Sequence, residues 1–172
     1  MGFERINWIE YYMDIAKVVS MRATCIRRRF GAIIVSKDNQ IISTGYNGAP
    51  RGIDDCLMSE SCLRNDLRIP SGERYELCKS VHAEQNAIIQ ASRNDMVEST
   101  MYIYGTNMAD NTVAEAFPCD ICRRMIINAG IEKVYISSQS GIMTSPTRIW
   151  GSHIYDVNEF ASLWGRVLKY EV

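Results

Sequence analysis

The chain has 172 residues, of which 47% are hydrophobic and 23% are charged, a composition that excludes disordered and low-complexity proteins. Nineteen Lys and Arg side chains against 20 Asp and Glu give a net charge of −1, which argues against long nucleic acid or an anionic membrane as a partner. Six cysteines accompany only two histidines, too few for a disulfide scaffold but more than core packing requires. We expect a single domain over residues 1–172 with clustered cysteine chemistry.

The N-terminal segment shows no targeting signal. Its charges at Glu4, Arg5, Glu10 and Asp14 interrupt any apolar stretch of the kind found in secretory signals. The longest apolar runs fall far short of the ~20 residues that a membrane span needs. We expect a cytoplasmic protein, in which thiols stay reduced and neighbouring cysteines serve as metal ligands or catalytic groups more often than as disulfides.

The first half of the chain predicts a helix, a hairpin and a long irregular segment. Apolar residues recur at helical spacing over 7–21, behind a capping residue at Asn7. Two β-rich runs, 31–36 and 40–46, surround a short polar turn and predict a hairpin. Residues 47–80 are rich in Gly, Pro, Asp, Arg and Cys without a clean period. A loop insertion of this length is uncommon and is usually functional or stapled by a metal.

The second half of the chain alternates helices and strands. The expected elements are a helix over 82–92, a strand over 100–104, a polar insertion over 107–117, a helix over 119–130, a strand over 133–137 and a short helix over 160–164. The resulting order, α-β-β-α-β-α-β, predicts a three-layer α/β/α fold in which one mixed sheet is flanked by helices.

Three residues are predicted to bind a metal ion. His82 lies at the start of one predicted helix, and Cys119 and Cys122 lie in the first turn of the next. Zinc prefers such ligands, and three protein ligands leave the fourth tetrahedral position for water, as in catalytic sites. Glu84 lies close enough to His82 to reach that position and to move protons. A lone histidine or a lone C-x-x-C is more often structural. Together with Glu84 and Pro118, however, they match H-x-E…P-C-x-x-C, the signature of zinc nucleobase deaminases.

At these motifs the chain resembles the cytidine deaminase superfamily, and within it the deoxycytidylate (dCMP) deaminases. The matching stretches are RRRFGAIIV from Arg27, IISTGYNGAPRG from Ile41, HAEQNAI from His82, FPCDICRRMIINAGI from Phe117 and KVYIS from Lys133. The resemblance implies the α/β/α deaminase fold and hydrolysis of dCMP to dUMP with release of ammonia, a step in pyrimidine metabolism that supplies dTTP precursors. It also implies zinc on His82, Cys119 and Cys122, and proton transfer by Glu84.

The resemblance further implies the substrate contacts and the assembly. Asn47, within GYNG, would contact the sugar, and the backbone N–H of Ala83 would contact the pyrimidine. Arg28 and Arg29 stand where the family places phosphate-side contacts, although a solvated basic turn accounts for them equally well. Many relatives form homo-oligomers, hexamers or dimers, and respond to dCTP and dTTP as allosteric effectors.

Four cysteines remain outside these motifs: Cys25, Cys56, Cys62 and Cys78. The resemblance implies a place for a second, structural zinc, because some dCMP deaminases bind one partly through cysteines located like Cys25 and Cys56. Four thiolates would make a closed site able to order a polar loop. The alternative is that two or more of them are ordinary buried small residues.

Two rival functions stay open on sequence grounds. One is a zinc deaminase of another nucleoside, nucleotide or nucleobase, or of a base in RNA, although the near-neutral charge weighs against RNA. The other is a non-catalytic zinc-binding module, which would need neither Glu84 nor an open coordination position. From about residue 139 the chain continues as a tail that diverges from the family.

Overall fold

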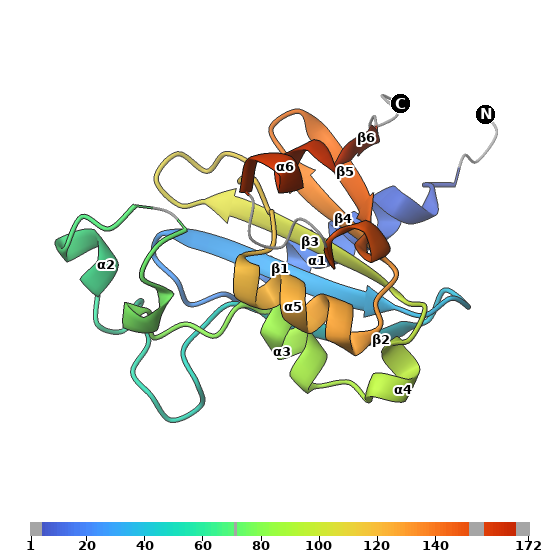
Figure 1. The fold of residues 1–172 in the computed structure, drawn as a ribbon. Coiled ribbons are helices and arrows are strands. Elements are labelled where there is room, and N and C mark those ends of the chain that lie inside the picture. The colour runs from blue at the N-terminus through green and yellow to red at the C-terminus, as the bar shows by residue number, and fades with distance from the viewer. Residues whose placement is uncertain (1–4, 71, 152–156, 168–172) are drawn as a thin grey trace.

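The computed structural model describes residues 5–70, 72–151 and 157–167, which form a six-stranded mixed sheet in the order β2-β1-β3-β4-β5-β6 (Figure 1). The strands are β1 (Arg28–Val35), β2 (Ile41–Tyr46), β3 (Thr100–Asn107), β4 (Lys133–Ser138), β5 (Gly141–Pro146) and β6 (Gly165–Val167). Strands β3 and β4 pair in parallel, and the other neighbouring strands pair antiparallel.

Six helices accompany the sheet in the described part of the chain. They are α1 (Trp8–Ser20), α2 (Leu63–Asp66), α3 (Ala83–Ile89), α4 (Arg93–Met96), α5 (Asp120–Ala129) and α6 (Val157–Ser162). Two 3-10 turns, η1 (Tyr75–Leu77) and η2 (Thr147–Ile149), complete the elements. Among the described helices, none has both the length and the apolarity that a bilayer crossing requires.

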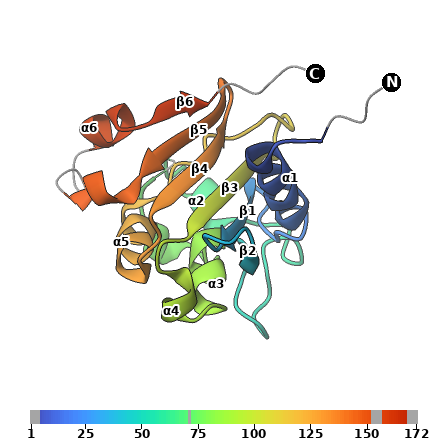
Figure 2. The ribbon, with the colours of Figure 1, turned by 90° about the vertical axis from the view of Figure 1, so that its right-hand side faces the viewer.

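Helices cover both faces of the sheet, so the predicted three-layer α/β/α fold is confirmed. Helix α1 lies on one face, and α3, α4 and α5 lie on the other (Figure 2). Alternate side chains of β1 enter the two cores: Ile33 packs on the α1 side, and Ile34 joins the larger cluster beneath α3 and α5. This alternation decides which strand residues can reach a site built by α3 and α5.

Helix α1 forms as its sequence predicts. The Asn7 side chain accepts a hydrogen bond from the backbone N–H of Glu10 at 3.0 Å and so caps the helix. Close packing on the sheet depends on Gly31 of β1, because a Cβ atom at this position would lie 2.2 Å from the carbonyl oxygen of Ala16. The predicted hairpin is also confirmed, as antiparallel pairing of β1 with β2.

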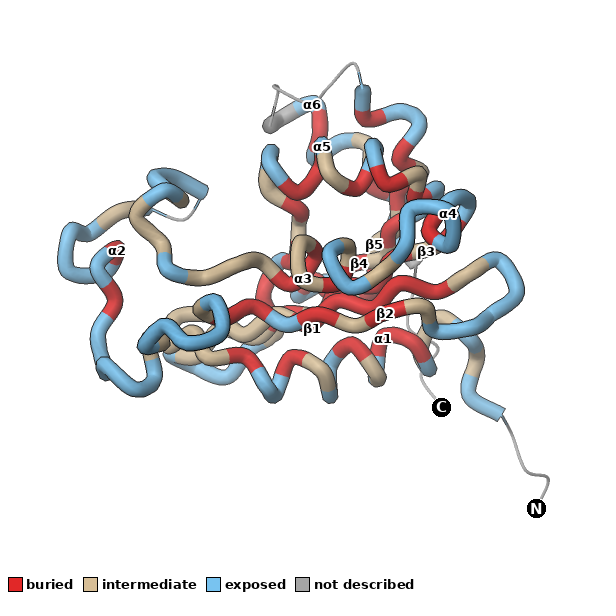
Figure 3. The backbone as a smooth tube through the Cα atoms, turned by 90° about the horizontal axis from the view of Figure 1, so that it is seen from below, coloured by how far each residue is buried: buried red, intermediate tan, exposed pale blue. Residues whose placement is uncertain are grey.

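The 47–80 segment extends from the sheet beside the N-terminal ends of α3 and α5 (Figure 1). It is mostly irregular and exposed, but it contains α2, the turn η1 and a short buried stretch around α2 (Figure 3). Because few of its residues belong to the main cores, its position depends on contacts with the site described below.

The tail contains more regular structure than its sequence predicts. The expected short helix is present as α6, but β5 and β6, which extend the sheet, were not predicted. Strand β5 reads GIMTSP and β6 has only three residues, so neither shows the apolar alternation typical of strands. Trp150, Phe160 and Trp164 pack together, and all three belong to the core on the α5 side. Aromatic burial therefore fixes the tail onto the sheet.

Candidate metal centre

The two motif helices begin at the same edge of the sheet and contact each other (Figure 1). Helix α3 leads towards β3 and α5 leads into β4, and these strands are parallel. Both helix N-termini therefore lie near the carboxyl ends of the strands, where sites of α/β proteins form. Helix α3 can pack this closely on β2 because residue 45 is a glycine. A Cβ atom at this position would lie only 2.3 Å from the carbonyl oxygen of Ala83.

The structure brings the three predicted ligands together. The Nδ1 atom of His82 lies 3.4 Å from the Sγ atom of Cys119 and 3.4 Å from that of Cys122. A tetrahedral zinc bonded to nitrogen and sulfur at about 2.0–2.3 Å holds these atoms about 3.5 Å apart, so the spacing fits zinc. Within the described ranges, no other group of three or more His, Cys, Asp or Glu side chains has its ligand atoms within 4.8 Å of one another.

His82 is held in place by neighbours on its own helix and in the 47–80 segment. Its backbone N–H donates to Oε1 of Gln85 at 2.9 Å, and Nε2 of Gln85 contacts Sδ of Met125 on α5 at 3.8 Å. The ring of Tyr75 meets the imidazole edge-on, with 4.8 Å between ring centres. The Gln85 bond thus fixes the start of the helix that carries His82, and the Tyr75 ring packs directly against the imidazole.

The ligand side chains share their protons unequally. Hydrogen bonds from Cys122 and His82 lower the pKa of the Cys119 thiol to about 4. Cys122, which donates its proton to Cys119 and is buried, has a strongly raised pKa. Burial is the largest single effect on the pKa of His82 and lowers it, but the hydrogen bond with Cys119 and the nearby charges of Glu84 and Cys119 together raise it overall. The centre thus holds a thiolate at neutral pH, and metal binding would release the remaining protons.

Glu84 lies in the first turn of α3 and lines the same cavity as the metal ligands. Its side chain is buried, at 6% exposure, and burial raises the pKa of its carboxyl group. His82 opposes this increase and the Cys119 thiolate adds to it. Raising the pKa makes the carboxyl group a stronger base than an exposed glutamate, which suits it to accept a proton and later to return it.

The cavity at the metal centre has a volume of about 880 Å³ and includes the predicted substrate contacts Asn47, Ala83 and Arg28 in its lining. The Asn47 side chain bridges β1: its Oδ1 accepts from the Phe30 N–H at 2.7 Å, and its Nδ2 donates to the Arg28 carbonyl at 3.0 Å. Arg29 is outside the lining, because successive strand residues face opposite sides and Arg29 belongs to the α1 side.

The four remaining cysteines all line this cavity as free thiols. Burial raises the pKa of Cys56, and the nearby thiols of Cys25, Cys62 and Cys78 raise it further. The structure therefore brings the four side chains into one neighbourhood, although they do not reach the spacing of the three ligands on α3 and α5.

Two residues at the site were missed by sequence reasoning, Tyr75 and Arg64. Arg64 of α2 places its guanidinium carbon 4.7 Å from the centre of the Tyr75 ring, and Tyr75 in turn contacts His82. Both lie in the 47–80 segment, which has no periodic pattern that would assign them to a site. The only available signal was the unusual length of that segment.

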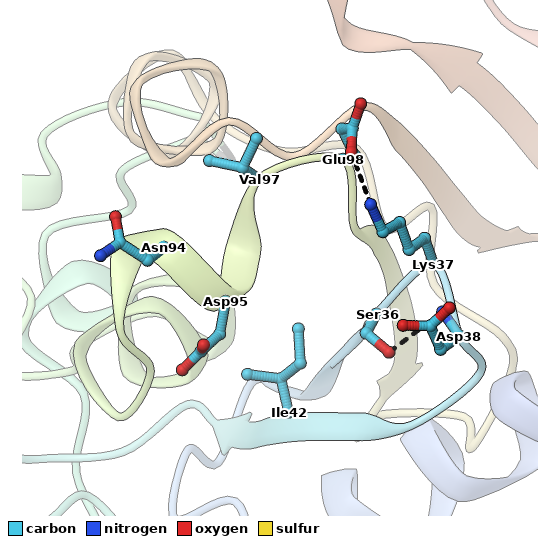
Figure 4. A pocket seen from close by; sticks show the side chains of 8 residues that line it. All are labelled: Ser36, Lys37, Asp38, Ile42, Asn94, Asp95, Val97 and Glu98. Atoms are coloured by element: carbon cyan, nitrogen blue, oxygen red, sulfur yellow. Dashed lines mark hydrogen bonds and ion pairs between the residues drawn. The ribbon is translucent and has the colours of Figure 1, made fainter.

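A second hollow, of about 530 Å³, lies between the β1–β2 turn and α4 (Figure 4). Lys37 and Glu98 form an exposed ion pair across it at 3.2 Å, and Asp38 and Asp95 also line it. It lies beyond the C-terminal end of α3 and contains none of the metal-centre residues. Exposed charges of this kind are typical of a solvated surface.

Comparisons with known proteins agree with this geometry. The family model of the cytidine and deoxycytidylate deaminase zinc-binding region matches residues 6–138. The chain is 33% identical to a deoxycytidylate deaminase of Mycobacterium phage D29, over 79% of this chain and 98% of the relative. It is 32% identical to the Schizosaccharomyces pombe deoxycytidylate deaminase over 76% of this chain, but spans only 37% of that longer relative.

A solved structure supports the same assignment. The dCMP deaminase of cyanophage S-TIM5, crystallised with dCMP and dUMP, is 26% identical and aligns with a TM-score of 0.51 over 78% of this chain and 83% of its own. The family match covers both helices of the metal centre and ends before the tail. The chain belongs to the cytidine and deoxycytidylate deaminase family of zinc-binding enzymes.

Proposed function

We propose that this chain hydrolyses dCMP to dUMP and ammonia, with zinc held by His82, Cys119 and Cys122. The observation that carries this proposal is the approach of the His82 Nδ1 atom to the Sγ atoms of Cys119 and Cys122, at 3.4 Å each, beside the buried Glu84. The substrate assignment is supported by the relatives, since the phage relative is named a deoxycytidylate deaminase and the cyanophage enzyme was crystallised with dCMP and dUMP.

In this mechanism Glu84 moves both protons. Zinc, when bound, supplies a Lewis acid that favours ionisation of water and stabilises negative charge at the reacting centre. Glu84 accepts a proton from the attacking water and delivers it to N3 of the pyrimidine while the new bond to C4 forms. It then carries the second water proton to the amino nitrogen, which leaves as ammonia when the C4–N4 bond breaks.

The substrate contacts follow from the cavity lining. The backbone N–H of Ala83 would orient the pyrimidine at the metal centre. Asn47 would contact the deoxyribose, because its amide retains one donor and one acceptor site beyond its two bonds to β1. Arg28 lines the cavity and is the better phosphate-side candidate, whereas the placement of Arg29 on the α1 side does not support a substrate contact.

A substrate panel tests this function. Ammonia release would be measured with dCMP, CMP, dCTP, deoxycytidine, cytosine and guanine, and we expect the highest kcat/KM for dCMP. Turnover confined to non-phosphorylated compounds would instead indicate another deaminase of the family. Ammonia release from none of them, together with salt-dependent nucleic-acid binding, would indicate a non-catalytic zinc module.

The same proposal includes assembly, regulation and location. We assign a homo-oligomer, a hexamer or a dimer, whose activity responds to dCTP and dTTP, on the strength of the family membership. Sedimentation, and the substrate panel repeated with each triphosphate, measure these properties. The reduced thiols of the cavity are consistent with a cytoplasmic location.

We also propose a second, structural zinc bound by Cys25, Cys56, Cys62 and Cys78. Their shared position in the cavity lining supports it, and closure of the site requires the four sulfurs to approach one another more closely. Metal analysis is expected to find about two zinc ions per chain, and about one after Cys62→Ser. The variant should keep its catalytic zinc but lose protease resistance over residues 47–80. About one zinc ion in the unmodified protein would contradict the proposal.

A further inference from the structure

Arg64 is a buried cation that forms no ion pair with any carboxylate of the described residues. Its side chain is only 7% exposed, yet it lines the cavity at the metal centre. Its Nη2 donates to the Pro70 carbonyl at 2.8 Å and its guanidinium stacks on Tyr75, but its Nε is buried without a hydrogen-bond partner in the described structure. A buried guanidinium is unfavourable unless an anion compensates it, so this arrangement indicates an anionic ligand.

Among the described residues, the carboxylates of the cavity lining leave Arg64 without an ion-pair partner, although Glu76 interacts with its charge at longer range. Four carboxylates line the cavity, and none forms an ion pair with Arg64. Glu76 pairs with Arg74, Asp120 pairs with Arg123, Glu115 accepts from the backbone N–H of Gln139, and Glu84 is buried at the metal centre. The missing anion is therefore expected to come from a bound molecule.

The position of Arg64 identifies that anion. Its guanidinium carbon lies 4.7 Å from the centre of the Tyr75 ring, and this ring lies 4.8 Å from that of His82. Arg64 therefore reaches the metal ligand only through the Tyr75 ring, which leaves its guanidinium for a part of the bound molecule other than the reacting base. A guanidinium also matches the geometry of phosphate oxygens and can bind two of them at once.

We propose that Arg64 binds the 5′-phosphate of the substrate and so selects nucleoside monophosphates over nucleosides. This inference rests on the proposed function and makes the 47–80 segment part of the substrate site. Tyr75 positions the guanidinium from one side while contacting His82 from the other. A substrate without a phosphate would leave Arg64 uncompensated and would therefore bind more weakly.

The kinetic test compares two substrates in three variants. In Arg64→Met, KM for dCMP is expected to rise about 10- to 100-fold, whereas kcat/KM for deoxycytidine stays within about threefold of the unmodified protein. Arg64→Lys keeps the charge but loses the planar guanidinium group that can bind two phosphate oxygens. Its KM for dCMP should therefore lie between those of the unmodified protein and Arg64→Met. Arg68→Met is the matched control, since Arg68 is exposed in the same segment and lies outside the cavity lining.

A binding measurement gives a second readout that does not depend on turnover. Calorimetry with dUMP and deoxyuridine should show weaker binding of dUMP alone in Arg64→Met, with unchanged zinc content and melting temperature. Equal decreases in kcat/KM for dCMP and deoxycytidine, with equal decreases in affinity for dUMP and deoxyuridine, would show that Arg64 has a merely structural role and would overturn the inference. An unchanged KM for dCMP would overturn it as well. Failure of the unmodified protein to deaminate dCMP would instead reject the proposed function, so the two failures are distinguishable.

Discussion

Replacement of Glu84 by glutamine is expected to lower kcat for dCMP by about 10²- to 10⁴-fold. The amide keeps the shape of the side chain in its buried position on α3 but can neither accept the proton of the attacking water nor return it to the leaving amine. Zinc content should be unchanged, because Glu84 is not among the three clustered ligands. Steady-state kinetics and metal analysis of the purified variant measure the two quantities.

Glu115→Gln is a matched control for this experiment. Glu115 lines the same cavity, but it is exposed and accepts a hydrogen bond from the backbone N–H of Gln139. The same chemical change at this position should therefore alter kcat by less than about threefold. If Glu84→Gln retained most of its activity while binding zinc normally, proton transfer by Glu84 would be wrong and another base would have to be sought.

Replacement of Cys122 by serine is expected to remove the catalytic zinc and to lower kcat/KM for dCMP by at least about 10³-fold. Cys122 is completely buried between His82 and Cys119, and a serine hydroxyl is a far poorer zinc ligand than a thiolate. Chelation of the unmodified protein should reproduce the loss, and added zinc should restore activity only to the unmodified protein. Metal analysis and ammonia release follow both effects.

The control for Cys122→Ser is Cys62→Ser, which changes another buried cysteine of the same cavity. That variant should keep zinc at the catalytic centre, because Cys62 is not part of the three-ligand group, and its kcat for dCMP should fall far less than that of Cys122→Ser. Activity of Cys122→Ser close to that of the unmodified protein would exclude a catalytic role for the metal.

The features predicted correctly from sequence depend on residues that are close together along the chain. Asn7 caps α1, Gly130 ends α5, and the spacing of Cys119 and Cys122 places both within one helical turn. The meeting of His82 with these cysteines was predictable because the parallel pairing of β3 and β4 followed from the order of the elements. Local rules together with the order of the elements therefore account for the metal centre and for strands β1 to β4.

The features that were missed depend on contacts between distant segments. Tyr75 reaches the site through an edge-on contact with His82, and Arg64 reaches it by lying over the Tyr75 ring; no periodicity in the 47–80 segment reports contacts of this kind. The face occupied by Arg29 could not be assigned before the register of β1 with its neighbours was known. In the tail, the aromatic packing of Trp150 and Phe160 holds short strands that have little β propensity of their own.

The positions of His82 and Cys119 at the helix ends link metal binding to folding. Each occupies the N-cap of its helix, a position usually taken by Ser, Thr, Asp or Asn because their side chains bond the free backbone N–H groups. A metal ion held by both residues acts as a clamp between two helix ends that are far apart along the chain. The free energy of metal binding then adds to the free energy of local unfolding of α3 and α5. Hydrogen exchange at the first turns of these two helices should therefore slow when the metal is bound.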